Sequence, residues 1–154
     1  YVLAKLLWDT DVDEEHAADE FIDSVYGAAA PHVRSYLKLI HDTIKPPENH
    51  LYTTVARISP FFDNPHITSD VIERGDALLS EAESILKSPE IRERVELLRL
   101  PMQFIRIRRM DDGSRRQNLI ERFRATAKRA GITQIAEGYS LDRWIEQGAR
   151  AAQR

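Results

Sequence analysis

The stretch that decides the fold runs from residue 68 to residue 109 and reads TSDVIERGDALLSEAESILKSPEIRERVELLRLPMQFIRIRR. Its apolar and small residues recur in steps of four and three, at Val71, Gly75, Leu78, Ala82 and Ile85, and again at Ile91, Val95, Leu98, Met102 and Ile105. This spacing places each set on one face of a helix. We therefore predict two helices that pack as an antiparallel hairpin.

The caps and breakers of this stretch predict where the two helices begin, end and bend. Thr68 or Ser69 can cap the first helix. Ser88 followed by Pro89 predicts a stop and an immediate restart, because proline is tolerated at the first helical position. Pro101 lies inside the second helix, removes one backbone hydrogen bond and predicts a kink there.

Helical patterns also fill most of the remaining chain. They cover residues 1–8, a segment after the polar break at 9–13 that ends at Gly27, and a segment from about residue 28 that stops at Pro46. A capping box at 114–117 opens a helix closed by Gly131, and Ser140 caps a last helix. Residues 48–67 are predicted to form an extended connection. The prediction is an all-α fold, with about seven helices in an irregular bundle and one long connection, and without β-α alternation.

Composition excludes several classes of protein. The chain has 154 residues, 22 Lys and Arg against 25 Asp and Glu, a formal net charge of -3, and no cysteine. Disulfide scaffolds, thiolate zinc sites and cysteine nucleophiles are therefore ruled out. The apolar runs are too short to span a bilayer, so no membrane partner is expected.

The first eight residues read as a helix already in progress. Tyr1 to Trp8 carries Leu3, Leu6 and Leu7 on one face, without a capping residue or an initiating Met before them. We expect this chain to be a piece of a longer polypeptide, with some functional residues on the missing part.

The acidic residues do not predict a metal or catalytic site. Asp9, Asp11, Asp13 and Glu20 match four positions of a calcium loop, but Glu14 stands where the loop needs glycine, so acidic capping of a helix is favoured. Glutamates recur on one helix and two aspartates share a turn, yet no pattern places them in a cleft as an acid/base pair: Glu90, Glu93, Glu96, Asp111 and Asp112. The histidines lack the helical spacing of zinc ligands: His16, His32, His41, His50 and His66. We therefore assign no catalytic residue, no metal ligand and no cofactor site.

Charge is unevenly distributed along the chain. Residues 1–67 hold 5 Lys and Arg against 11 Asp and Glu, whereas residues 68–154 hold 17 against 14. The basic excess gathers within residues 106–129, at Arg106, Arg108, Arg109, Arg115, Arg116, Arg122, Arg124, Lys128 and Arg129. Because these residues flank a turn and circle two helices, a solvated face or a domain interface is favoured over nucleic-acid binding.

Several stretches, in their order along the chain, resemble one family. They are residues 3–9, 21–31, 33–37 and 78–85, Arg94-Val95, Arg99-Leu100-Pro101, Gly131-Ile132 and Glu137-Gly138. Together they resemble the region that ends the catalytic barrel in large bacterial glycoside-hydrolase-like proteins. Those proteins carry a domain of unknown function and are similar in layout to α-glucuronidases and β-N-acetylhexosaminidases.

The resemblance implies a division of the chain and an accessory role. Residues 1–8 would be the last helix of a missing (β/α)₈ barrel, and residues 9–154 a C-terminal helical domain. This domain would pack against the barrel of the same polypeptide, shape one wall of its sugar cleft or build a homodimer interface. The barrel strands that hold catalytic carboxylates are absent here, so none is carried over.

A second hypothesis comes from a different class of function. The chain would be a free-standing helical interaction module that binds a protein or nucleic acid through the arginine-rich residues 106–129. In either case we expect a soluble protein, and the choice between the bacterial cytoplasm and export stays open.

Overall fold

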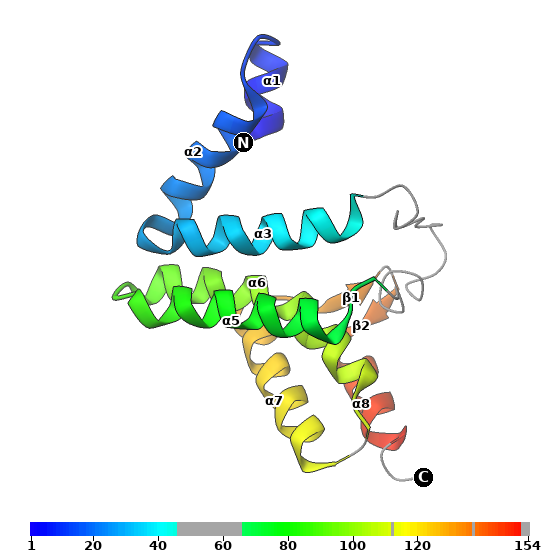
Figure 1. Ribbon diagram of the computed structural model, residues 1–154. Helices are drawn as coiled ribbons and strands as arrows, with labels where there is room; N and C mark the ends of the chain where they lie inside the picture. Colours follow the sequence, from blue (N-terminus) through cyan, green and yellow to red (C-terminus); the bar gives the residue numbers. More distant parts are fainter. Residues whose placement is uncertain (46–65, 112, 137, 152–154) are drawn as a thin grey trace.

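The computed structural model describes residues 1–45, 66–111, 113–136 and 138–151, and in them seven α-helices and one two-stranded sheet (Figure 1). The helices are α1 (Val2–Trp8), α2 (Glu14–Tyr26), α3 (Ala30–Ile44), α5 (Ser69–Ile85), α6 (Pro89–Arg109), α7 (Ser114–Arg129) and α8 (Leu141–Ala151). A 3₁₀ turn, η1 (Gly27–Ala29), joins α2 to α3. The predicted all-α fold is confirmed. The connection predicted at 48–67 lies, as far as residue 65, outside the described residues.

Helices α5 and α6 form the predicted hairpin, with the predicted caps. The Thr68 hydroxyl accepts a hydrogen bond from the Val71 amide at 3.3 Å, and the Ser88 hydroxyl accepts one from the Ile91 amide at 3.4 Å. One part of the predicted seam is wrong. Ile85 is 47% exposed, whereas Leu79 and Leu86 are buried. The reason is that α5 packs against α3 as well as α6, so that its buried face points between two neighbours.

Helix α6 takes part in two hydrophobic cores. The first core joins α2, α3, α5 and one face of α6, with Val33, Leu79, Val95 and Ile105 at its centre. The second joins the C-terminal part of α6 to α7, the strands and α8. Its centre is an aromatic cluster in which Trp144 lies 4.6 Å from Phe104 and 5.4 Å from Phe123 between ring centroids. The two halves of the molecule are therefore held by one helix.

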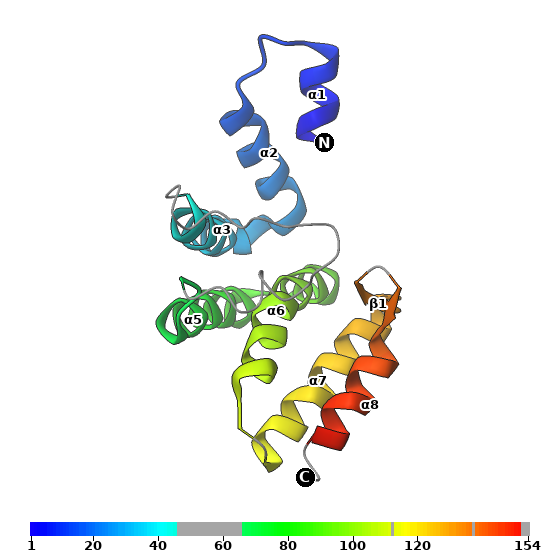
Figure 2. The ribbon, with the colours of Figure 1, turned by 90° about the vertical axis from the view of Figure 1, so that its right-hand side faces the viewer.

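The predicted bend in α6 is visible in the ribbon. Figure 2 shows that α6 first runs beside α5 and then turns along α7, with Pro101 inside the helix. Proline lacks the N–H of the regular helix and its ring displaces the preceding turn, which changes the direction of the axis.

The ends of α7 give one correction and one confirmation. The capping box predicted at 114–117 is wrong, because Gly113 precedes the helix and Ser114 already lies in its first turn, without a side-chain cap. The stop at Gly131 is confirmed. Gly131 has φ 70°, its amide bonds to the Lys128 carbonyl, and the Ile132 amide reaches the Ala127 carbonyl at 2.9 Å. These two bonds are those of a Schellman motif.

The segment after Gly131 contains structure that the sequence analysis missed. Strands β1 (Gln134–Ala136) and β2 (Tyr139–Ser140) pair antiparallel, where only a short apolar connection was expected. Ser140 then caps α8 as predicted, by accepting a hydrogen bond from the Arg143 amide at 3.2 Å. Strands this short offer no measurable alternation, so they carry no clear signal in the sequence.

Helices α1 and α2 project from the rest of the molecule as an arm (Figures 1 and 2). No residue of α1 is buried. It is attached to α2 by an ion pair between Lys5 and Glu20 and by the rings of Tyr1 and Phe21, whose centroids lie 5.6 Å apart.

Within the described ranges, no helix combines the length and the apolar character needed to cross a bilayer.

Tyr36 joins α3 to the α5–α6 hairpin. Its side chain is buried, and its hydroxyl donates a hydrogen bond of 2.9 Å to the carbonyl of Leu98. Its ring passes over Gly75, where a Cβ atom would lie only 3.2 Å from Cε2 of Tyr36. Glycine in this helix therefore makes room for the ring. Burial raises the pKa of Tyr36 to about 12, and the charge of Arg99 opposes this only in part.

We predict that replacing Tyr36 by Phe changes stability in opposite directions at neutral and alkaline pH. At pH 8 the variant loses one hydrogen bond, which costs about 1 kcal/mol of unfolding free energy. An unfolded tyrosine ionises near pH 10, whereas folded Tyr36 stays protonated until about pH 12. The native protein therefore loses stability as pH rises through this window, on the order of 2 kcal/mol by pH 11.5.

The measurement is urea unfolding of both proteins at pH 8 and pH 11.5. All other titratable groups are the same in the two proteins. The difference in unfolding free energy between the proteins therefore reports on Tyr36 alone. The Phe variant should be the less stable protein at pH 8 and the more stable one at pH 11.5. If the same protein is the more stable one at both pH values, Tyr36 does not have the raised pKa of a buried phenol.

Candidate functional site

A groove between α6 and α7 is lined by several charged side chains and consists of two adjoining pockets. The outer pocket, of about 260 Å³, is lined by Glu93, Glu96, Leu97, Thr126, Arg129 and Ala130. The inner pocket, of about 220 Å³, is lined by Glu83, Glu96, Arg99, Gln103, Arg122, Ala125, Thr126 and Arg129. They share three residues and form one continuous surface, named here the α6–α7 groove.

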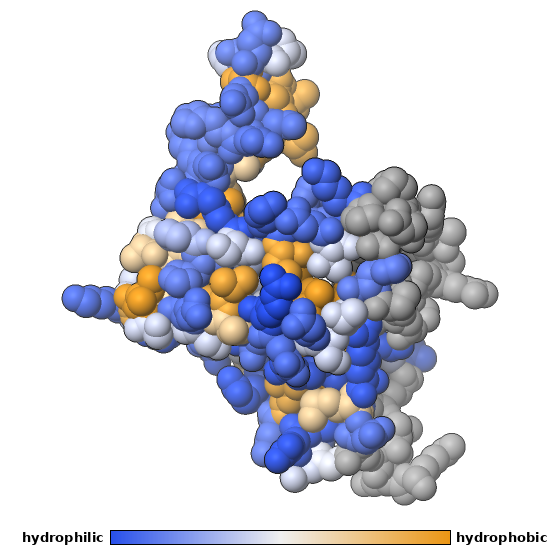
Figure 3. Space-filling model, in the orientation of Figure 1, coloured by the Kyte–Doolittle hydropathy of each residue, from blue (hydrophilic) through white to orange (hydrophobic). Residues whose placement is uncertain are grey.

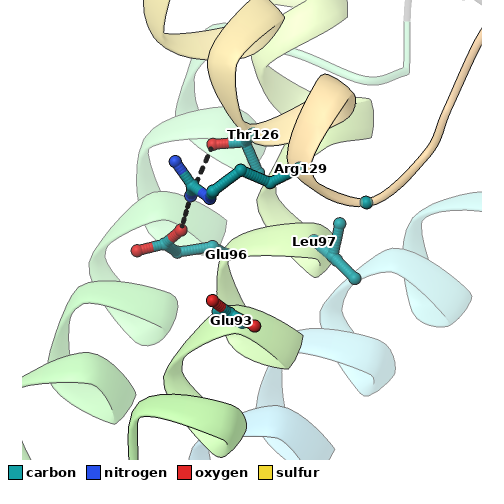
Figure 4. Close-up of a pocket in the computed structure, with 6 residues that line it drawn as sticks. Glu93, Glu96, Leu97, Thr126 and Arg129 are labelled. Atoms are coloured by element: carbon teal, nitrogen blue, oxygen red, sulfur yellow. Dashed lines mark hydrogen bonds and ion pairs between the residues drawn. The ribbon is translucent and has the colours of Figure 1, made fainter.

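Figure 4 shows how the outer pocket is assembled. Glu93 and Glu96 lie one turn apart on α6, and Arg129 reaches across from α7. The Arg129 guanidinium donates to Glu96 at 2.5 Å and to the Thr126 hydroxyl at 3.4 Å. The structure thus brings two of the acidic candidates together. One of them is held in an ion pair, while Glu93 is exposed and has no ion pair with any described residue.

The floor of the inner pocket is a buried ion-pair network centred on Arg99. Its guanidinium, in a side chain only 9% exposed, contacts Asp76 and donates to Glu83 at 2.9 Å. Burial works to lower the pKa of Arg99, but the hydrogen bond with Glu83 and the charge of Asp76 outweigh it and raise the pKa. Asp76 also faces Arg106, at 3.6 Å. The network ties α5 to α6 across their polar edge.

Gln103 lies beside this network and is an exception to it. The side chain is 9% exposed and lines the inner pocket. Its Oε1 atom is buried without a hydrogen-bond partner among the described residues. Buried amide groups are nearly always paired, because an unmade bond costs the full desolvation of the group. Gln103 therefore has unused hydrogen-bonding capacity next to a polar pocket.

The sequence analysis missed most of this network, although a signal for it is present. On α6, Glu96, Arg99 and Gln103 follow at steps of three and four, and Arg99 and Gln103 each stand between two apolar residues. On α5, a matching polar set recurs at Asp76, Ser80 and Glu83. Polar residues at helical spacing on both arms of a hairpin indicate a buried polar contact.

The calcium-loop candidates are used for other contacts. The Asp13 side chain caps α2 by accepting from the His16 amide at 3.0 Å, and Asp9 accepts from the Asp11 amide at 3.0 Å. Glu20 lies within α2 and pairs with Lys5, which lowers the pKa of Glu20. Within the described residues, no three acidic or histidine side chains are grouped as a metal site. The interpretation as helix capping accounts for these contacts.

The other predicted candidates are dispersed. Glu90 lies exposed in the first turn of α6, Asp111 is exposed after that helix, and Asp112 lies outside the described residues. Of the histidines, His32 faces Glu81 at 3.3 Å, His16 and His41 are exposed on α2 and α3, and His66 precedes α5. His50 lies outside the described residues. Of these residues, none that the structure describes lines the α6–α7 groove.

Most of the arginine-rich segment is engaged within the chain. Arg109 donates to the carbonyl of Ile67, and Arg116 donates to that of Ile107 at 3.0 Å. Arg124 and Lys128 both contact Asp142 of α8, at 3.1 and 3.4 Å, and lower its pKa. Arg115 and Arg122 are exposed and have no ion pair among the described residues. These basic side chains largely fasten α7 to its neighbours.

A second surface of functional interest is the apolar face of α1. Leu3, Leu7 and Trp8 are 76%, 87% and 92% exposed. Figure 3 shows hydrophobic residues gathered along one side of the arm, whose other side is mostly hydrophilic. Single exposed apolar residues are ordinary, but three on one short helix form a patch of the kind found at interfaces.

We predict that Arg99→Met destabilises the protein by about 2 kcal/mol. Removing one partner from a buried ion pair leaves the others uncompensated, which costs about 3 to 5 kcal/mol when all are buried. The cost is smaller here because Asp76 and Glu83 are 34% and 25% exposed and regain some solvation. The check is chemical unfolding, with Arg124→Met as the matched control.

Arg124 pairs with the exposed Asp142, so its replacement should cost less than about 1 kcal/mol. Equal losses in the two variants would show that Arg99 contributes no more than a surface pair.

Comparison with known proteins gives one partial match. Residues 1–38 match the family model described as "Domain of unknown function (DUF4838)". The matched part comprises α1, α2, η1 and the first half of α3, about a quarter of the chain. No curated protein and no solved structure matches the chain. The comparison therefore links residues 1–38, which form the arm and the first part of α3, to a domain of unknown function.

Proposed function

We propose that this chain is a non-catalytic helical region of a glycoside-hydrolase-like protein, which docks on a catalytic barrel through the apolar face of α1. The observation that carries the proposal is the exposure of Leu3, Leu7 and Trp8 on a helix without buried residues. The ordered resemblance to proteins of that class supports it. So does the match of the arm to a domain of unknown function.

The size and chemistry of the apolar face fit a contact within one polypeptide. An aromatic side chain alone can bury about 150 to 250 Å², and Trp8 is almost fully available. Burying Leu3, Leu7 and Trp8 together would contribute several kcal/mol, at about 25 cal/mol per Å². That gain is useful when the two parts are linked, because a covalent connection removes most of the entropy cost of association.

The α6–α7 groove offers no ready catalytic pair for glycoside hydrolysis. Such a pair needs two carboxyl groups facing each other across a bound sugar, one of them in a surrounding that raises its pKa. Glu93 and Glu96 instead project from neighbouring turns of one helix, and Glu96 is bound to Arg129. This geometry favours an accessory role for the chain.

The proposal is tested by comparing this chain with the complete product of its gene. The 154 residues contain two tryptophans, so the quenching of Trp8 is obtained in each protein as the difference from its Trp8→Phe variant. In the 154-residue chain acrylamide should quench Trp8 as strongly as a free indole. In the complete product we expect a barrel-forming sequence before Tyr1 and a several-fold weaker quenching of Trp8. Equal quenching in both proteins would refute docking through α1.

The absence of catalysis is tested separately, on the 154-residue chain. We expect no turnover of aryl glycosides or aryl glucuronides above the buffer rate. Turnover that Glu93→Gln abolishes would refute the accessory role, and Glu90→Gln on the same helix serves as the control.

The alternative, an interaction module that binds through residues 106–129, makes a different prediction. Phosphate contacts by arginine would give binding to DNA or RNA that weakens steeply with salt. Arg115→Gln is the cleaner probe, since Arg116 also supports the carbonyl of Ile107. Salt-sensitive binding that is lost in this variant would favour the alternative over the accessory role.

A further inference from the structure

Within the arm, which the structure describes in full, the side-chain charges without an ion pair are all acidic. The single Lys or Arg of residues 1–26 is Lys5, and it is bound to Glu20. Asp19 and Asp23 are paired with Arg34 of α3. Five exposed carboxylates have no ion pair with any described residue: Asp9, Asp11, Asp13, Glu14 and Glu15. The arm therefore carries a negative charge that nothing in the described chain offsets.

These carboxylates lie next to the most exposed part of the apolar face of α1. Leu7 and Trp8 belong to the last turn of α1, and Asp9 is its C-cap. The other four follow in the loop and in the first turn of α2. Figure 2 shows this loop at the tip of the arm, away from the body of the molecule. A partner that covers Trp8 must therefore also come close to several carboxylates.

The charge opposes two of the surfaces that could cover an apolar helix face. A second arm laid against the first would bring two sets of five like charges together, which repel across an interface. A bilayer that contains anionic lipids has a negative surface potential, which attracts basic segments and repels acidic ones. A surface with basic side chains is attracted instead, and it also satisfies the carboxylates that docking removes from water.

We propose that the surface on which α1 docks is an apolar depression bordered by lysine or arginine side chains. The depression receives the Trp8 indole, and the basic border faces the carboxylates of residues 9–15. This inference rests on the proposed docking of α1 within the same polypeptide. The apolar contact provides most of the affinity, whereas the charges select the surface and the orientation in which α1 meets it.

The test is hydrogen exchange at the backbone amides of α1, measured in the complete gene product and in the 154-residue chain. Exchange reports the opening of α1 even when nearly every molecule is docked. The α1 amides should be at least about tenfold better protected in the complete product. Raising the salt concentration from about 0.05 M to about 0.5 M should lower this protection several-fold, because salt screens exposed charge pairs.

Two double variants of the complete product locate the charges. Asp11→Asn combined with Glu15→Gln should lower the protection of α1 about threefold or more at low salt, because two ion pairs at the border are lost. The matched control combines Asp111→Asn with Glu90→Gln. It also removes one exposed aspartate outside a helix and one glutamate from the first turn of a helix, but both lie outside the arm. The control should leave the protection unchanged.

The outcomes separate this inference from the docking on which it rests. If α1 is no better protected in the complete product than in the 154-residue chain, docking itself is refuted, and the basic border with it. If α1 is protected but neither salt nor the arm variant lowers the protection, docking stands and the basic border is refuted. Equal losses in the two double variants would also refute the border.

A second copy as the occupant gives its own result. Protection of α1 in the 154-residue chain would then rise with protein concentration, and this outcome would overturn the inference. The salt series uses the unmodified sequence. It therefore decides the question even if the substitution of Glu15 weakens the first turn of α2.

Discussion

The structure depends on the constraint that α6 must pack against two different sets of neighbours. One face of α6 contributes Val95, Met102 and Ile105 to the first core, and another contributes Leu100, Phe104 and Ile107 to the second. An amphipathic helix with a single apolar stripe could serve only one core, so α6 carries two stripes that overlap along its C-terminal half. Pro101 bends the helix within this shared stretch.

Polar contacts strengthen α6 close to that bend. Tyr36 donates to the carbonyl of Leu98, and the next residue, Arg99, carries the ion pairs with α5. The face of α6 that bears Arg99 also forms the floor of the groove with α7. Fold and candidate site therefore rest on the same two turns. Next to this network, the Oε1 atom of Gln103 is buried without a partner among the described residues.

Long periodic segments made the architecture predictable from the sequence. The step pattern from Val71 to Ile105, the Ser88-Pro89 restart and the stop at Gly131 are local signals with a direct physical cause, and the structure contains all three features. The same reasoning failed where tertiary contacts decide. Ile85 fits the helical stripe but is exposed. Helix α5 packs against α3 as well as α6, and Leu79 and Leu86 are buried instead. The groove was not predicted, because its residues come from three helices whose mutual rotation a single sequence does not specify.

The sharing of α6 also has a consequence for how the molecule unfolds. Both cores pack against α6, so the loss of either core would remove part of the packing that holds this helix. The two cores should therefore unfold as one cooperative unit. Helix α1 stands outside that unit, since it buries no residue and is joined to α2 mainly by side-chain contacts at its surface. Its amides belong to the class that opens by local fluctuation, at a small fraction of the global unfolding free energy. Helix α1 can therefore open while both cores stay folded.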